Sequence, residues 1–342
     1  MSRASLTCML KRFGSVEFGI AVALCVSLTA TVGARTKNTK KRPVPKPRNP
    51  AAVKLDCGDL VGFQVLLDRQ GFSPAQIDGK PGANFSHTLS ALQAAKKLPS
   101  SGQPDCATWQ ALGGGGAEPT VITYTIAPGD LKGPFEKLPK RLEDQAKLPA
   151  LGYQSPIELI AERYHAAPPL IVQLNPGVNL AEGRPIKVPA VTPFDPDAKP
   201  AKDLTAGDVT IQVSREESAL RATRADGTLV FFAPVSSGSI HDPLPPGDWK
   251  VTGVGWHPVF HYNPDLFWDA KATATKATIK AGPNNPVGVV WIDLSVEHYG
   301  LHGTPEPSRI GHTESHGCVR LTNWDAARLA SLVKAGTPVL FR

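Results

Sequence analysis

The alternation of apolar and polar residues in the last third of the chain constrains the fold most strongly. Val209 to Val213, Ala219 to Arg224 and Thr228 to Val235 alternate with a period of two, as half-buried β-strands do. Ala225-Asp226-Gly227 separates the last two runs and predicts a hairpin turn. Two later runs predict further strands, Trp249 to Val254 and Val287 to Leu294.

One strong helix follows these strands. Asp325 to Lys334 places Ala326, Leu329 and Val333 on one face, and Gly336 marks its end. Strands that are followed by a single late helix indicate a β-rich α+β domain, which we place at residues 205–342.

The first 34 residues have the order of a secretory signal peptide. Three basic residues precede an apolar run from Phe18 to Val32, and the small residues Gly33 and Ala34 follow it. A membrane span needs about 20 apolar residues, and this run is shorter. We therefore predict a protein exported to the periplasm or cell envelope and cleaved after Ala34, with an uncleaved signal anchor as the alternative.

The positive charge of the chain lies before its folded part. Residues 1–48 hold ten basic residues and one acid, which leaves 27 basic and 29 acidic residues in 49–342. Residues 35–52 carry seven positive charges and four prolines and predict an extended basic linker. Membrane contact is expected only through this linker or an uncleaved signal. No nucleic-acid partner is expected, because that needs basic residues clustered on a folded face.

Cleavage of the signal would leave three cysteines. In an oxidising compartment two of them would pair and one would remain. Cys57 and Cys106 bracket one small module, so we predict a disulfide between them. Cys318 is then a free thiol, which is either buried and inert or a nucleophile.

Residues 53–116 have the pattern of a compact helical module. Leu60, Phe63 and Leu67 recur at helical spacing before Gly71, and Ile77-Asp78-Gly79 is a turn signal. Further helices are predicted at Ser86 to Leu98 and Thr108 to Leu112. This order of glycines and core residues resembles the three-helix peptidoglycan-binding module.

Residues 120–192 have a strand–helix–helix–strand pattern. Ser155-Pro156-Ile157-Glu158 is a capping box, and a second helix is expected at Pro169 to Asn175 before a strand at Arg184 to Pro189. The pattern resembles the LysM domain, whose family binds glycans that contain N-acetylglucosamine. About twenty extra residues intervene between Asp130 and Ser155. The segment is either a glycan-binding module or a spacer that packs on the C-terminal domain.

Residues with catalytic potential gather in two short runs, 299–304 (Tyr-Gly-Leu-His-Gly-Thr) and 315–321 (Ser-His-Gly-Cys-Val-Arg-Leu). Cysteine is nucleophilic as thiolate and needs a base nearby, and the spacing allows His302 or His316. Gly317 lets a substrate approach backbone N–H groups that could hold an oxyanion. Arg320 offers a fork to a carboxylate.

These runs resemble the catalytic signature of the L,D-transpeptidase family with its YkuD-type domain, His-Gly…Ser-His-Gly-Cys-x-Arg. The similarity extends to Pro245-Pro246-Gly247, Asn285-Pro286-Val287-Gly288, Asn323, Asp325 and Gly336-Thr337-Pro338-Val339. The resemblance implies a role for each matching residue. Cys318 would be the nucleophile, His302 the general base oriented by the Gly303 carbonyl, and His316 would shape the site. Arg320 would contact the substrate's carboxylate, and Ser315 would support the loop.

The resemblance also implies the reaction. The thiolate would cleave the bond between the L-centre of the third residue and D-alanine in a peptidoglycan tetrapeptide stem. The acyl group would pass to an amine of a second stem (a 3→3 cross-link), to a protein lysine, or to water, which would make the enzyme an L,D-carboxypeptidase. Stem peptides and glycan strands are the implied partners, with no cofactor and no metal. A non-catalytic peptidoglycan-binding scaffold is the remaining alternative.

Several aromatic residues and histidines of residues 205–342 have no role in these runs. Their spacing matches no HExxH or similar metal motif, so we expect surface or hydrogen-bonding roles for His241, His257, His261 and His298. Trp291 lies inside an apolar strand and is expected in the core. The segment from Trp256 to Trp268 is expected to form a loop over the cleft.

Overall fold

The computed structural model describes residues 55–342. They belong to one compact unit, 53–342. The predicted signal peptide at 1–34 and the basic linker at 35–52 lie outside the described residues. No helix within 55–342 combines the length and the apolar character that a membrane crossing needs.

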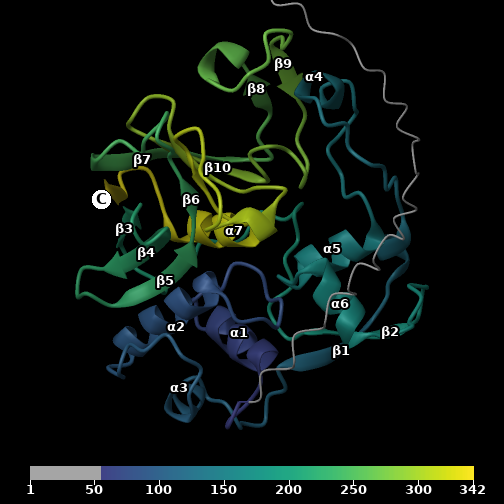
Figure 1. Cartoon of the computed structure of the whole chain (residues 1–342), viewed down its shortest axis with the longest axis vertical. Helices are drawn as coiled ribbons and strands as arrows, with labels where there is room; N and C mark the ends of the chain where they lie inside the picture. Colours follow the sequence, from purple (N-terminus) through teal and green to yellow (C-terminus); the bar gives the residue numbers. More distant parts are fainter. Residues whose placement is uncertain (1–54) are drawn as a thin grey trace, which may run out of the picture. The chain divides into compact units, whose positions relative to one another are not determined.

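Three helices build the first part of the described chain (Figure 1): α1 (Leu60–Arg69), α2 (Ala83–Ala95) and α3 (Cys106–Ala111). Asp59 caps α1 by accepting from the Gly62 N–H at 2.8 Å, and Asp105 caps α3 by accepting from the Thr108 N–H at 2.7 Å. A disulfide joins Cys57 to Cys106 and ties the start of α3 to the segment before α1.

A strand–helix–helix–strand unit follows. Its strands β1 (Val121–Thr125) and β2 (Pro185–Pro189) pair antiparallel, and α5 (Pro156–Arg163) and α6 (Pro168–Leu174) lie between them in sequence. Ser155 caps α5 by accepting from the Glu158 N–H at 3.2 Å. The reciprocal bond runs from the Gln154 N–H to the Glu158 carboxylate at 2.7 Å, one residue before the cap. The short η1 (Pro128–Leu131) follows β1, and the extra residues between η1 and α5 contain α4 (Leu142–Gln145).

The C-terminal part contains a nine-stranded mixed sheet with the order β5-β4-β3-β13-β7-β10-β11-β12-β6. Its strands are β3 (Val209–Ser214), β4 (Ala219–Arg224), β5 (Leu229–Pro234), β6 (Ser236–Ser237), β7 (Gly247–Trp256), β10 (Val290–Leu294), β11 (Gly300–His302), β12 (Val319–Arg320) and β13 (Pro338–Phe341). The remaining elements are a hairpin of β8 (Phe260–Tyr262) and β9 (Ala277–Ile279), the short η2 (Pro264–Leu266) and η3 (Pro307–Arg309), and α7 (Asn323–Leu332).

The predicted strands and the single late helix are confirmed in this domain. Helix α7 begins two residues before the predicted start, because Thr322 is its cap and accepts from the Asp325 N–H at 3.1 Å. Strand β10 begins at Val290 rather than at the predicted Val287, because Asn285 accepts from the Val287 N–H at 2.9 Å and holds a turn there.

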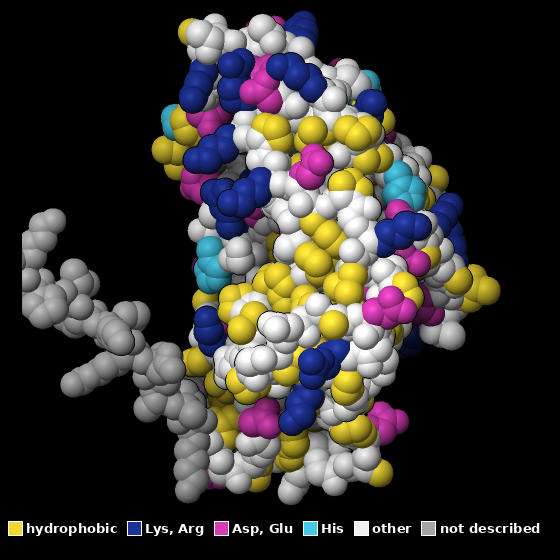
Figure 2. Space-filling model, turned by 90° about the vertical axis from the view of Figure 1, so that its right-hand side faces the viewer, with side chains coloured by type: hydrophobic (Ala, Val, Ile, Leu, Met, Phe, Trp, Pro, Cys, Tyr) yellow, Lys and Arg dark blue, Asp and Glu magenta, His cyan; other side chains and the backbone are white. Residues whose placement is uncertain are grey.

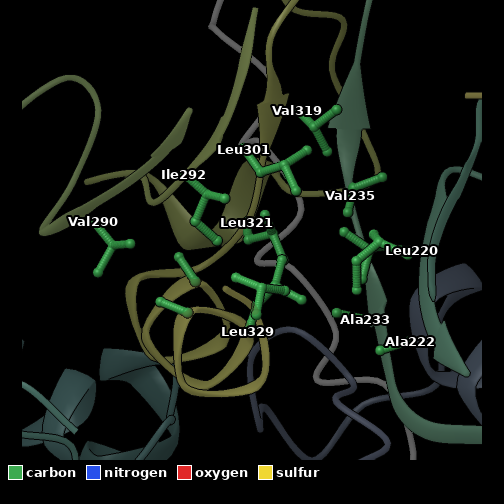
Figure 3. Packing of buried hydrophobic residues seen from close by; sticks show 14 of the residues in the cluster. Leu220, Ala222, Ala233, Val235, Val290, Ile292, Leu301, Val319, Leu321 and Leu329 are labelled. Carbon is green, nitrogen blue, oxygen red and sulfur yellow. The ribbon is translucent and has the colours of Figure 1, made fainter. Parts of the chain in front are cut away.

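The core of this domain lies between the sheet and α7. Figure 3 shows Leu329 of α7 between side chains of β10 and β11 on one side and side chains of β4 and β5 on the other. Leu329, Ile292, Leu301 and Leu220 are fully buried. Removal of this apolar area from water is the main force that fixes β11, and β11 carries a candidate catalytic residue.

The helical module packs directly on the sheet edge. Strand β5 lies at the end of the sheet, and Phe232 exchanges backbone hydrogen bonds with residues 71–73: its N–H donates to Gly71 at 2.9 Å and its carbonyl accepts from Ser73 at 2.8 Å. Phe232 and Ala219 also share a buried cluster with Phe72 and apolar residues of α1 and α2. The module therefore covers an edge that would otherwise be open to aggregation.

Candidate active site

His302 ends strand β11, between β10 and β12. Its Nδ1 lies 2.7 Å from the Gly303 carbonyl oxygen, which can only accept, so Nδ1 carries the proton. In the neutral imidazole Nε2 then has a free lone pair. Trp291 on β10 is the register partner of His302 on β11, and its indole stacks on the imidazole with ring centroids 5.4 Å apart.

The imidazole of His302 is neutral at ordinary pH. The residue is only 3% exposed, and burial, aided by the positive charge of Arg320, lowers its pKa to about 3. The bond to the Gly303 carbonyl opposes this shift but does not cancel it. The geometry thus provides a base of fixed orientation that starts without a proton on Nε2.

Cys318 directly precedes β12, which pairs in parallel with β11. Its Sγ lies 3.7 Å from the His298 carbonyl oxygen, to which the thiol donates. Burial raises the pKa of the thiol, while the Gly300 N–H and the charge of Arg320 partly lower it again. Both Cys318 and His302 are therefore neutral at rest, in contrast to a thiolate–imidazolium pair.

The turn before Cys318 is tied to the neighbouring strand end. Ser315 Oγ donates to the Cys318 carbonyl at 2.5 Å and accepts from the Gly238 N–H at 2.7 Å. Gly317 has φ +98°, and a Cβ there would lie 2.7 Å from the ring of Tyr299. Backbone conformation and close packing both require glycine beside the thiol.

His316 is engaged by the segment between β8 and β9. Its Nε2 lies 2.8 Å from Asp269 Oδ1, and its ring packs against Phe267. Its Nδ1 is buried without a hydrogen-bond partner among residues 55–342. The segment predicted to form a loop over the cleft contains both Phe267 and Trp268, and Trp268 also lies near His316.

A cavity of about 990 Å³ brings together Cys318, His302, His316 and Arg320. The other predicted residues, Gly303, Ser315 and Gly317, are not among its lining and act through hydrogen bonds or space, as described above. Trp291 lines the cavity, so its expected place in the core is wrong: Gly300 has no side chain, and the indole lies over that position instead. The residues 140–143 also line this cavity.

Two glutamates of α5 accept hydrogen bonds from residues that pack beside the site. The sequence analysis did not predict these contacts. Asn323 Nδ2 donates to Glu162 Oε1 at 2.7 Å, and Asn284 Nδ2 donates to Glu158 Oε1 at 2.8 Å. Asn323 Oδ1 accepts from the Val289 N–H at 3.2 Å and packs so close to Gly303 that a Cβ there would lie 2.2 Å away. We call Glu158, Glu162, Asn284 and Asn323 the α5 clamp.

A signal for the clamp exists in the sequence. Glu158 and Glu162 are four residues apart on α5, and two acids at this spacing repel each other unless one is neutral or paired. Burial raises the pKa of Glu162 to about 8, so that it is neutral at pH 7 and repulsion from Glu158 is avoided.

A second buried carboxyl lies on α7. Asp325 accepts hydrogen bonds from Ser73 Oγ at 2.8 Å and Thr322 Oγ1 at 2.7 Å. Burial raises its pKa to about 7 despite these bonds. Ser73 belongs to the helical module, so this contact also joins the module to α7.

The four other histidines considered above differ in their surroundings. His241 stacks on Trp268 at 4.1 Å, His261 and His298 line the cavity, and His257 lies elsewhere. Within residues 55–342 no three His, Cys, Asp or Glu side chains gather as a set that could hold a metal ion.

Known proteins match this chain across its C-terminal part. Residues 208–340 match the model of the YkuD family, described as the L,D-transpeptidase catalytic domain. A Bacillus licheniformis protein named "Putative L,D-transpeptidase YkuD" is 31% identical over 186 residues, 54% of this chain and 91% of that protein. "Probable L,D-transpeptidase YbiS" of Escherichia coli is 27% identical over 56% of this chain and 61% of that protein.

A solved structure was also found. The L,D-transpeptidase from Mycobacterium smegmatis has 19% identity, a TM-score of 0.32, and coverage of 40% of this chain and 58% of that one. The sequence matches carry the assignment, because the Bacillus licheniformis relative is covered almost completely. The chain therefore belongs to the L,D-transpeptidase (YkuD) family and is an L,D-transpeptidase enzyme.

Proposed function

We propose that this protein is an exported cysteine L,D-transpeptidase that acts on peptidoglycan tetrapeptide stems. Cys318 attacks the carbonyl of the third residue's L-centre and forms a thioester, and D-alanine leaves. An amine of a second stem then takes the acyl group, which gives a 3→3 cross-link. The observation that carries the proposal is that the Cys318 thiol and His302, with its tautomer fixed by the Gly303 carbonyl, line one cavity.

The neutral pair determines how the first step proceeds. His302 Nε2 takes the thiol proton as sulfur attacks, because a separated thiolate and imidazolium are disfavoured in the buried site. The imidazolium then protonates the leaving amine of D-alanine. In the second step neutral His302 takes a proton from the attacking amine and gives it to the sulfur as the thioester bond breaks, which regenerates the thiol and neutral His302.

Arg320 and the backbone supply the charges that oppose developing negative charge. Arg320 lines the cavity, and its pKa is lowered by burial while it stays a cation. We assign it to a substrate carboxylate. N–H groups beside Gly317 are assigned to the oxyanion of the tetrahedral intermediate.

Export is supported by the sequence order of residues 1–34 and by the disulfide. A bond between Cys57 and Cys106 persists in an oxidising compartment and leaves Cys318 as the free cysteine of residues 55–342. The periplasm or cell envelope also holds the proposed substrate. A protein lysine as acceptor is the same chemistry with a different amine.

The test is intact-mass spectrometry of the mature protein with a disaccharide-tetrapeptide, with and without an acceptor stem, and with Cys318→Ala as the control. Loss of D-alanine with a 3→3 dimer, absent from the control, is the expected result. Tripeptide without dimer would assign water as the acceptor. A folded protein with a free Cys318 and neither adduct nor turnover would overturn the proposal.

A further inference from the structure

The extra residues between η1 and α5 form a wall of the catalytic cavity. Lys140, Arg141, Leu142 and Glu143 line the same cavity as Cys318 and His302, although 159 to 178 residues separate them in sequence. A strand–helix–helix–strand unit does not need this segment for its own pairing, because β1 and β2 pair with each other without it.

The segment is packed against the β8–β9 hairpin. Leu138, Leu142 and Ala146 pack in a cluster around Leu151, Tyr262 and Ile279. The Thr275 N–H donates to Glu143 Oε1 at 3.0 Å, and the Leu151 N–H donates to the Ala281 carbonyl at 3.1 Å. Figure 1 shows α4 beside β9 accordingly. The connection between β8 and β9 also contains Asp269, which is hydrogen-bonded to His316. The extra segment and the turn that contains His316 therefore both contact this hairpin.

The charges of this wall favour an anion. Arg141 is 60% exposed and its Nε contacts Glu143 at 3.4 Å, while its terminal nitrogens have no hydrogen-bond partner among residues 55–342. Lys140 is exposed and makes no ion pair within residues 55–342. Of the acids that line the cavity, Glu143 is occupied by the Thr275 N–H and by Arg141, and Asp269 is occupied by His316. Asp242 and Glu297 complete the acids of the lining.

Figure 2 shows Lys and Arg side chains gathered in the upper part of the face, the end of the molecule at which Figure 1 places α4 and β9. The extra segment and the hairpin region carry eight basic residues in their sequence: Lys132, Lys137, Lys140, Arg141, Lys147, Lys271, Lys276 and Lys280. Among these, the lining of the catalytic cavity includes Lys140, Arg141 and Lys271.

We propose that Lys140 and Arg141 form a second cationic subsite, which binds a peptide carboxylate remote from the scissile bond. The ligand class rests on the proposed function: a stem peptide carries several carboxylates, and Arg320 beside the thiol accounts for one of them. The subsite recognises a second carboxylate, either on the stem that acylates Cys318 or on the stem that accepts the acyl group.

The experiment measures binding, so that it does not depend on turnover. Calorimetry in the Cys318→Ala background gives Kd for two peptides, a tetrapeptide donor and a tripeptide that serves only as acceptor. Each peptide is used with its remote carboxylates free and converted to carboxamides. The test variant is Lys140→Ala/Arg141→Ala. The matched control, Lys132→Ala/Lys147→Ala, removes two cations of the same segment that do not line the cavity.

We expect the test variant to weaken binding of a free-carboxylate peptide about tenfold, or about 1.4 kcal/mol. The amidated peptide should bind test variant and control alike. A loss confined to the tetrapeptide assigns the subsite to the donor, and a loss confined to the tripeptide assigns it to the acceptor. Equal losses for free and amidated peptides, or no loss relative to the control, would overturn the subsite.

The outcome is separable from that of the proposed function. If the wild-type protein does not acylate Cys318 and the charge-dependent loss of binding is still found, the subsite stands and the proposed reaction falls. If acylation proceeds and the loss is absent, only the subsite falls.

Discussion

Buried titratable groups lie in two regions next to residues 300–325. One region is the catalytic cavity, and the other is formed by the contacts of α7 with α5 and the helical module. On the cavity side, His302 and Cys318 are neutral because burial lowers the pKa of the imidazole and raises that of the thiol. Where α7 meets α5 and the helical module, burial raises the pKa of Asp325 on α7 and of Glu162 on α5, which accepts from Asn323. Burial thus shifts all four groups toward their uncharged forms.

The difference lies in their hydrogen bonds. Asp325 accepts from Ser73 and Thr322, and Glu162 accepts from Asn323. In the cavity, Nδ1 of His302 is fixed, and Nε2 is left to react. A buried group whose hydrogen bonds are all made stabilises one arrangement of the fold. A buried atom that keeps a free lone pair, such as Nε2 of His302, can instead take a proton. The α5 side thus acts as the fixed support for the reactive side.

The largest effect is expected from removal of the nucleophile. Cys318→Ala should abolish acylation, with a fall in kcat of about 10⁶ as for other covalent catalysts. Intact-mass spectrometry with the donor peptide checks it. The side chain contributes no contact of the α5 clamp, so the free energy of unfolding should change by less than about 1 kcal/mol. A covalent acyl adduct on another residue of the variant would contradict the assignment.

The next effect separates the two histidines. His302→Ala should lower kcat by about 10²–10⁴, the usual contribution of a general base. His316→Ala should cost only about tenfold, because its Nε2 is bound to Asp269 and it shapes the segment over the cavity. Single-turnover acylation at saturating donor measures both.

A second readout distinguishes base from structural support. The rate of Cys318 alkylation by iodoacetamide, followed from pH 5 to 10, reports the ionisation of the thiol. His302→Ala should change the shape of this pH profile, and His316→Ala should leave the shape unchanged. The reverse result would transfer the role of base to His316.

The sequence predicted the catalytic residues that line the cavity, but it did not predict the contacts of α7 with α5 and the helical module. The runs around His302 and Cys318 are local, so spacing and resemblance predicted them, and the alternating strands predicted the sheet that carries them. Glu162 and Ser73 lie 161 and 252 residues from their partners on α7. The spacing of Glu158 and Glu162 indicates that one acid is neutral or paired, but no local pattern identifies the partner. Trp291 was misplaced for a related reason: alternation gives the face of a strand but not the neighbour, Gly300, that opens space for an indole.

The α5 clamp is tested by a smaller effect. Glu162→Ala leaves the Asn323 amide short of a partner and should cost about 1–3 kcal/mol in the free energy of unfolding. Since Asn323 packs on Gly303, whose carbonyl orients His302, kcat should also fall about tenfold with little change in KM. Denaturant unfolding and acylation kinetics measure these quantities.

Two further variants make the clamp prediction specific. Glu162→Gln should restore kcat, because the native carboxyl is neutral at pH 7 and an amide oxygen can accept the same bond from Asn323. Glu182→Ala, at an exposed acid outside the clamp, should match the wild type. A Glu162→Ala enzyme that is destabilised but keeps its kcat would restrict the clamp to a structural role.

The smallest effect is the pH dependence that Glu162 gives to stability. Its pKa is about 8 in the folded protein and about 4.3 when unfolded, so the folded state holds the extra proton between these values. Its contribution to stability is complete below pH 4 and is lost as the pH rises to 8, with a slope of about 1.4 kcal/mol per pH unit. Glu162→Gln cannot titrate, so between pH 6 and 7 the free energy of unfolding of the wild type should fall by about 1 kcal/mol more than that of the variant. Asp325 titrates in the same direction in both proteins and cancels in the difference. Parallel curves in guanidinium unfolding at the two pH values would show that Glu162 is already ionised in the fold, and the contrast between a neutral support and a neutral reactive pair would then be lost.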